Sequence, residues 1–451
     1  MSPSSAHRLY LVGSFVVLSG CAGSPRLDVT PQITSLAWSD AVTGGTAAPD
    51  ADLAGLLGSP ALADLIARAQ ATSPRLLGAT ARIDQARALA RLARGASLPS
   101  LSIGTNVSAN SRAGGSALDF VSNFATIDAA LSIDFAGGAA AGRRSATQRV
   151  VAARNDREAL VILLTAELAR TYVSRAALQA RVSLIDQSIN QAAQLQTIIE
   201  LRQHEGVATR VDVGLQAIRV QQLRAERERL QQSLDETRVA LSLLVGEEAP
   251  GFEIVAADIK QFAIPDIAPP LPSRLVATRP DVRAAEARIE AAGGDVRQAR
   301  AAFFPQLDLS LGRNAQSFLG SGILSGFSIG ADLVAPIFNR GRLKGNLDLA
   351  SARQREAVQN YREVLLAALA DVETGLSAAG HARKRASILA AVTGEARQTA
   401  TLARVQYLEG DADLRHLLDA QDLLINAQDA ELVSRQERLE AAIALFRVSQ
   451  A

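Results

Sequence analysis

The chain of 451 residues contains the same pattern twice, at an interval of about 205 residues. Residues 81–86 match residues 287–292, and Pro99, which precedes a run of alternating residues, matches Pro305. A duplication on this scale predicts two halves that repeat one order of helices and strands. Any fold proposed for the chain must therefore contain this unit two times.

We place the two copies at residues 60–246 and 273–449. Residues 247–272 between them form a connector, because prolines interrupt both helices and sheets there. The prolines of this segment are Pro250, Pro265, Pro269, Pro270 and Pro272.

Each copy contains two short runs in which apolar and polar residues alternate, at about 98–110 and 124–136 and again at about 305–316 and 326–338. A period of two predicts β-strands with one apolar and one polar face, as in the walls of membrane barrels. A half-buried sheet of a soluble domain has the same pattern. Phenylalanines at the ends of these runs, where an interfacial aromatic girdle lies, favour the membrane interpretation. They are Phe120, Phe124, Phe135, Phe303, Phe304, Phe318, Phe327 and Phe338.

Four strands cannot close a barrel, since single-chain barrels of the outer membrane begin at about eight strands. An open sheet edge in lipid leaves backbone groups unpaired, at a large free-energy cost. The sequence therefore predicts that several chains share one barrel.

After each pair of strands the sequence predicts two long helices, at about 142–203 and 212–244 and at about 342–407 and 416–448. A helix of about 60 residues is roughly 90 Å long, more than a compact globule needs. Apolar residues recur at coiled-coil spacing, which indicates packing between neighbouring helices. One such stripe is Leu160, Leu163, Leu164, Leu168, Val173 and Leu178.

Composition excludes several classes of protein. The 47 basic and 46 acidic residues leave a net charge of +1, which argues against a nucleic-acid partner. A single cysteine and scattered histidines give no metal site, and we expect no cofactor. Residues 326–330 match the hydrolase motif Gly-x-Ser-x-Gly, but alternation runs straight through them where a strand, turn and helix are required. We expect no enzymatic activity.

The N-terminus has the layout of a secretion signal. The apolar run of residues 9–18 is too short to span a bilayer, and small residues lead directly to Cys21. Residues 1–20 are predicted to be a signal peptide, Cys21 a lipidation site, and residues 21–59 a loose linker. Leu-Ser-Gly-Cys resembles the lipobox of bacterial lipoproteins. Ala22 stands directly after the cysteine, and the resemblance implies that a lipoprotein with alanine rather than aspartate there goes on to the outer membrane.

Taken together, these features resemble the outer-membrane efflux proteins of the TolC and OprM kind, in particular the NodT-like lipoprotein branch that works with RND-type pumps. The resemblance covers the chain from Cys21 to about Ser449. It implies a homotrimer in which three chains pool their strands into one β-barrel, while their helices form a tunnel through the periplasm. The motifs that carry it are Arg279-Pro280-Asp281-Val282, Phe304-Pro305, Tyr407-Leu408-Glu409-Gly410 and Leu417-Leu418-Asp419-Ala420-Gln421.

The resemblance also implies a gate at the periplasmic tips of the helices. Asp419 matches an aspartate that forms a ring at the narrowest point, and Tyr407 matches a tyrosine whose hydroxyl ties neighbouring helix pairs together. Asp212 matches the carboxylate that accepts that bond. His416 stands where the family has an aspartate, and its ordinary pKa lies near neutrality. The two helix turns, at Gly206 and Gly410, are the expected docking tips.

A second departure lies just after the second tip. Where one branch of the family has an arginine, this chain has Asp411 and Ala412. We therefore expect the gate to be held shut by different partners.

The expected function is that of the outer-membrane exit duct of a tripartite efflux pump. Its partners would be a periplasmic membrane-fusion adaptor, an inner-membrane RND-type transporter and outer-membrane lipid. The alternatives are a lipid-anchored periplasmic coiled-coil adaptor or structural protein, and the outer channel of a type I secretion system. The sequence does not indicate the exported substrate.

Overall fold

The computed structural model of the protein describes residues 38, 52–110, 120–267, 272, 277–318 and 323–450. All of them belong to one compact unit, Ile33–Ala451. Cys21, the expected signal peptide and most of the expected linker lie outside the described residues. No described helix is long and apolar enough to cross a bilayer.

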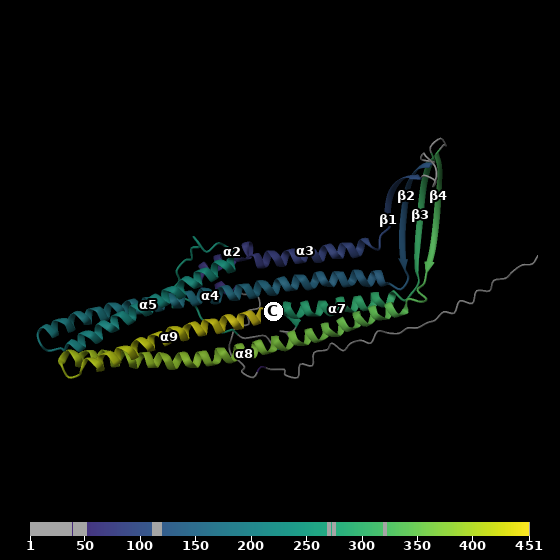
Figure 1. Cartoon of the computed structure of the whole chain (residues 1–451). Coiled ribbons are helices and arrows are strands. Elements are labelled where there is room, and N and C mark those ends of the chain that lie inside the picture. Colours follow the sequence, from purple (N-terminus) through teal and green to yellow (C-terminus); the bar gives the residue numbers. More distant parts are fainter. Residues whose placement is uncertain are drawn as a thin grey trace, which may run out of the picture. The chain divides into compact units, whose positions relative to one another are not determined.

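The first half of the chain contains, in order, α1 (Leu53–Leu57), α2 (Pro60–Thr72), α3 (Pro74–Gly95), β1 (Ser100–Asn110), β2 (Phe120–Asp134), α4 (Gly138–His204) and α5 (Arg210–Val245). The second half contains α7 (Pro280–Ala301), β3 (Gln306–Phe318), β4 (Ile323–Val334), α8 (Arg340–Glu409) and α9 (Leu414–Ser449). Both halves therefore run from a helix through two strands to a very long helix and a shorter one (Figure 1). The predicted fold class, long helices with a small sheet and an internal duplication, is confirmed.

The expected linker 21–59 is not loose throughout, because α1 forms inside it. The carboxylate of Asp52 accepts hydrogen bonds from the backbone N–H of Ala54 (3.3 Å) and Gly55 (3.1 Å), which caps the helix. Gly58 ends it at φ 68°, a left-handed conformation that glycine adopts without strain.

The strand limits differ from the expected ones at the helix-proximal ends. β4 ends at Val334 instead of near 338, because Pro336 has no N–H to donate to a ladder. β2 ends at Asp134 instead of near 136, since its carboxylate accepts from the N–H of Ala136 and Ala139, both at 2.8 Å. The bond to Ala139 satisfies an N–H in the first turn of α4 that has no partner within the helix, and α4 begins at Gly138 rather than near 142.

The four strands form one antiparallel sheet in the order β1-β2-β3-β4. Each half contributes one pair of adjacent strands, β1 with β2 and β3 with β4. Strand β2 joins the two pairs by pairing with β3, as at Ala129 and Leu311. In this register Leu101, Ala129, Leu311 and Ile329 form one row across the sheet. The edges β1 and β4 have a strand neighbour on one side only.

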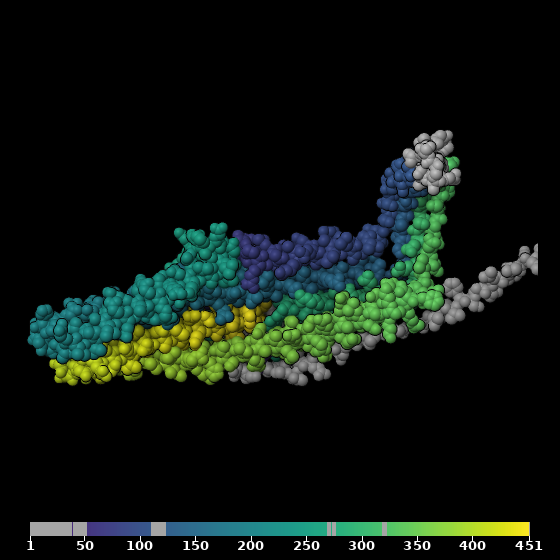
Figure 2. All heavy atoms as spheres, in the orientation of Figure 1, coloured from purple at the N-terminus to yellow at the C-terminus, as the bar shows by residue number. Residues whose placement is uncertain are grey.

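Helix α4 packs against α3, α5, α7 and α9, and α8 packs against α7 and α9. The core nearest the connector includes Leu57, Leu62, Tyr172, Leu241 and Ile443, all at most 1% exposed. We call α4 with α5 the first hairpin and α8 with α9 the second hairpin. Figure 2 shows the two hairpins, teal and yellow, lying together toward their turns.

Helices α4 and α7 approach so closely that two glycines are required. A Cβ on Gly138 would lie 2.6 Å from the Cβ of Ala301, and one on Gly294 would lie 2.8 Å from the Cβ of Ser145. Nothing larger than hydrogen fits at either position without separating the helices. An ion pair between Arg149 and Asp295 (2.6 Å) lies beside this contact.

Candidate functional site

The sheet exposes its apolar face. Ile103, Phe327 and Ile329 are 73%, 79% and 76% exposed, although cross-strand pairing orders their backbone. An uncovered apolar surface of this kind requires an apolar surrounding, such as lipid, to be stable.

The opposite face of the sheet is polar and tightly spaced. Asp128, Gly312 and Ser328 lie in one row across the three strands β2, β3 and β4. A Cβ on Gly312 would lie 2.9 Å from both Asp128 Oδ1 and Ser328 Oγ. The polar face therefore suits a water-filled interior, while the apolar face suits lipid.

The two hairpins end in the same tight turn. Gly206 and Gly410 have φ of 78° and 87°, and both are exposed. In the first turn the carbonyl of Arg202 accepts from the N–H of Val207 at 2.8 Å, and in the second the carbonyl of Gln406 accepts from Asp411 at 2.8 Å. The expected docking tips are thus two equivalent turns with their backbone satisfied.

Asp212 serves the turn that precedes it. Its Oδ2 accepts from the N–H of Thr209 (2.7 Å) and from the Thr209 hydroxyl (2.8 Å), while Thr209 Oγ1 accepts from the N–H of Asp212 (3.2 Å). This capping box fixes the start of α5. Among the described residues, no hydrogen bond joins Asp212 to Tyr407.

Tyr407 is 7% exposed and packs in an apolar cluster with Ile199 and Leu417, so that it connects the two hairpins through its ring. The guanidinium of Arg202, on α4, lies 4.9 Å from the centre of that ring. The same guanidinium donates to the carbonyl oxygens of Tyr407 (3.2 Å) and Leu408 (3.0 Å). Arg202 therefore holds the last turn of α8, whose carbonyls have no partner within the helix.

Asp419 is exposed on α9, and Asp422 lies one turn further along that helix. Asp422 forms an ion pair with Arg219 of α5, whose side chain is 20% exposed. Burial raises the pKa of Asp422, the Arg219 guanidinium lowers it, and the Asp419 carboxylate raises it again. The ion pair of Asp422 and Arg219 thus lies close to the tip and near the charge of Asp419.

His416 is exposed in the first turn of α9. Its backbone N–H donates to Oδ1 of Asp413 at 2.8 Å, so Asp413 caps that helix. Among the described residues, no group of three or more His, Cys, Asp or Glu side chains could hold a metal ion.

A third arginine joins the hairpins further from the tip. Arg181 of α4 donates from Nε (2.5 Å) and Nη2 (2.9 Å) to the two carboxylate oxygens of Asp429 on α9. This bidentate geometry is the strongest form of arginine–carboxylate pairing. Arg202, Arg219 and Arg181 therefore form three successive links between the first and second hairpins, which we call the arginine links.

The sequence did not identify these links. Each one joins residues that are between 203 and 248 positions apart, so finding it requires the register of two helices against each other. Arginines are also common throughout the chain, and their spacing does not separate the linking ones from the rest. The missing tip arginine after Gly410 and His416 in place of an aspartate are the sequence features that indicated other partners at the gate.

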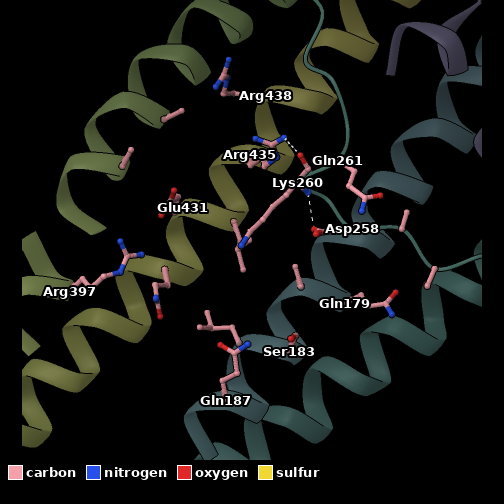
Figure 3. Close-up of a pocket in the computed structure, with 18 residues that line it drawn as sticks. Gln179, Ser183, Gln187, Asp258, Lys260, Gln261, Arg397, Glu431, Arg435 and Arg438 are labelled. Atoms are coloured by element: carbon pink, nitrogen blue, oxygen red, sulfur yellow. Dashed lines mark hydrogen bonds between the residues drawn. The ribbon is translucent and has the colours of Figure 1, made fainter. Parts of the chain in front are cut away.

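Arg435 ties the connector to the second hairpin beside a cavity of about 1030 Å³. Arg435 donates to the carbonyl oxygens of Ile259 (2.9 Å), Lys260 (2.9 Å) and Phe262 (3.0 Å). Burial lowers the pKa of Arg435, and the neighbouring Arg438 lowers it further. Figure 3 shows Arg435 reaching the connector from α9, with Gln187 on α4 across the cavity.

Comparison with known proteins identifies the family. The family model for outer membrane efflux proteins matches residues 65–247 and 271–449. The pyoverdine export outer membrane protein OpmQ of Pseudomonas putida is 32% identical over 401 residues, covering 86% of this chain and 85% of the relative. The protein of the same name from Pseudomonas aeruginosa is 30% identical over 456 residues, covering 98% and 96%.

A solved structure has the same fold over nearly its whole length. The crystal structure of a membrane protein from Pseudomonas aeruginosa matches with a TM-score of 0.82 and 27% identity, covering 92% of this chain and 96% of that one. The arrangement of the sheet and the two long helical hairpins is therefore shared with that structure. With its strands, helices and both copies of the repeat accounted for, the chain belongs to the outer membrane efflux protein family.

Proposed function

We propose that three copies of this chain form the exit duct of a tripartite pump that exports small molecules across the outer membrane. One observation carries the proposal: each chain joins a sheet with an exposed apolar face to helices of 67 and 70 residues. Such helices are about 100 Å long, enough to extend a membrane pore far into the periplasm. Four strands per chain require other copies to close the barrel.

An inner-membrane RND-type transporter supplies the energy in this proposal, and a periplasmic membrane-fusion adaptor meets the tips at Gly206 and Gly410. The equivalence of the two turns supports this assignment, because one adaptor surface would then fit both. Small-molecule cargo is proposed because the two relatives are named for pyoverdine export.

The gate in this proposal lies at the same tips. Three exposed Asp419 carboxylates around one pore would repel anions and attract cations, as charged rings do in channels. Arg202 takes the place of the arginine that is missing after Gly410, and Tyr407 holds the hairpins together through its ring. Asp212 supports the gate indirectly by fixing the start of α5, and His416 lies beside the ring.

Cys21 is proposed to carry the lipid that anchors the chain in the outer membrane. A Cys21→Ser variant should no longer incorporate labelled palmitate, yet it should stay in the membrane after alkaline washing because the sheet still inserts. Loss of the variant from washed membranes would show that the lipid alone holds the protein there.

Conductance in a planar bilayer tests the channel itself. The purified, lipidated protein should give small cation-selective openings, and Asp419→Ala should weaken that selectivity. Tyr407→Phe tests whether the tyrosine hydroxyl contributes to the gate. Asp411→Ala is the matched control for Asp419→Ala, because it removes an exposed carboxylate of the same tip.

A silent bilayer from a protein that washes off membranes as a monomer would refute the channel and favour the lipid-anchored adaptor. Equal effects of Asp419→Ala and Asp411→Ala would refute the ring but leave the channel intact.

A further inference from the structure

A pocket rich in arginine lies where the helices meet the sheet. It has a volume of about 630 Å³ and is lined by Arg94 of α3, by Arg143 and Arg144 of α4, and by Glu290 and Arg297 of α7. Four positive charges thus face one negative charge. We call this feature the junction arginine pocket.

Most of its positive charge has no partner among the described residues. Arg143 Nη1 donates to Ser97 Oγ at 2.6 Å. Within the described part of the chain, the side chains of Arg94, Arg144 and Arg297 make neither a hydrogen bond nor an ion pair with protein. Guanidinium groups that outnumber the neighbouring acids raise the local potential and attract an anion that accepts several hydrogen bonds, for which phosphate is the best geometric match.

The position of the pocket along the chain indicates which phosphate. Arg144 lies six residues after Gly138, or about 9 Å along α4, and Arg297 lies about 6 Å before the end of α7. Phe135, Phe304 and Phe338, in the segments between sheet and helices, are 68%, 55% and 100% exposed. Aromatic side chains of this kind mark the boundary between hydrocarbon and headgroups.

The headgroup layer beyond that boundary is about 5–8 Å thick, and an arginine side chain reaches across several ångströms of it. We propose that the junction arginine pocket binds the phosphate of an anionic phospholipid in the periplasmic leaflet. The inference rests on the proposed membrane position of the sheet. The pocket fixes the depth of the chain in the bilayer by holding a headgroup between α3, α4 and α7.

The internal duplication shows that the fold itself does not require this charge. With Gly138 aligned on Gly341, Arg143 and Arg144 fall on Asn346 and Leu347 of the second copy. The helix–strand junction forms in both copies, but the basic residues of the second long helix lie earlier along it, at Arg340, Arg342 and Lys344. The arginine pair at positions 143 and 144 is therefore particular to the first copy of the repeated unit.

Lipid binding to the delipidated full-length trimer tests the proposal, with native mass spectrometry as the readout. Phosphatidylglycerol should bind more tightly than phosphatidylcholine with the same acyl chains. Arg144→Gln combined with Arg297→Gln should weaken phosphatidylglycerol binding about 30-fold, which corresponds to about 1 kcal/mol for each arginine near a membrane surface. Phosphatidylcholine binding should not change.

The control combines Arg353→Gln with Arg355→Gln, which removes the same charge from exposed positions on α8 further from the sheet. Arg94→Gln, a single exposed substitution, provides a second variant if the double variant does not assemble. Bilayer conductance of each variant shows separately whether the channel is intact.

Three results would overturn the proposal. The first is an equal loss of phosphatidylglycerol in the control and the test variants. The second is displacement of the lipid by inorganic phosphate at the same concentration, which would make the site a free-phosphate site. The third is a changed ion selectivity with unchanged lipid binding, which would place the pocket on the wall of the tunnel.

Discussion

Removing Arg202 should loosen the tip of the second hairpin. The Arg202 side chain makes two charge-assisted hydrogen bonds to backbone carbonyls, at 3.2 and 3.0 Å, and lies 4.9 Å from the ring centre of Tyr407. Hydrogen bonds to charged groups contribute about 1.5–3 kcal/mol each when buried, and a cation–π contact at an exposed site contributes about 0.5–1 kcal/mol. Because the guanidinium is partly exposed and solvent screens these interactions, we reduce their sum to about 2–3 kcal/mol in total.

That loss corresponds to an increase of about 30- to 150-fold in the population of the opened tip. Amide hydrogen exchange of the trimer measures it directly at Asp411, whose N–H donates to the Gln406 carbonyl in the turn that Arg202 supports. Arg202→Gln should speed exchange there by this factor. Arg202→Lys should have an intermediate effect, because it keeps the charge but loses the planar fork.

Arg210→Gln is the control for this experiment. Arg210 is exposed at the start of α5, close to the same tip. If exchange at Asp411 rises no more in Arg202→Gln than in Arg210→Gln, the arginine does not hold the tip, and the reasoning from its three contacts is wrong. Larger bilayer openings in Arg202→Gln would further show that this tip belongs to the gate.

Three other predictions concern the links, the helix contact and the sheet. Since burial raises the pKa of Asp422, the folded tip binds a proton at this carboxylate more tightly than the unfolded chain does. The stability of the tip should therefore fall as the pH rises from the ordinary aspartate range through the raised pKa. Hydrogen exchange measured against pH should show this fall in the wild-type protein and lose it in Asp422→Asn. Gly294→Ala should destabilise the protein in urea by about 1–3 kcal/mol, because the added methyl group overpacks against α4. Gly78→Ala, in open space on α3, should stabilise the protein by about 0.5–1 kcal/mol. Equal effects of the two variants would contradict the close approach of α4 and α7. Ile329→Arg, on the apolar face, should destabilise the membrane-inserted protein by about 2–4 kcal/mol near the bilayer centre, while Ser328→Arg on the opposite face should destabilise it much less. The amount of heat-resistant trimer on gels reports both effects. The reverse order would show that the two faces are assigned wrongly.

The repeated elements could be predicted from the sequence because their signals are local. Alternation between Leu101 and Ala109 reports a strand without knowledge of its neighbours, and the tip glycines repeat with the surrounding residues. The limits of β2 and β4 could not be predicted as well, since they depend on a capping carboxylate and a proline whose influence extends several residues.

The arginine links could not be predicted for a different reason. Arg219 and Asp422 meet only because α5 and α9 adopt one register, which depends on all the side chains packed between the hairpins. The expected bond between Tyr407 and Asp212 shows the same limit, because each residue matches a family position while its contact depends on neighbours that differ here. The roles of these residues in gating stay predictions.

Helix α7 packs against both α4 and α8, whereas α3 packs mainly against α4 and leaves Leu77, Leu89 and Leu92 at 56%, 54% and 68% exposure. A newly made chain therefore carries an uncovered helix flank as well as an uncovered sheet face. Both surfaces would favour aggregation for as long as the chain stays alone in water. The yield of functional protein therefore depends on relative rates. Membrane insertion and assembly must be faster than the self-association of single chains in water.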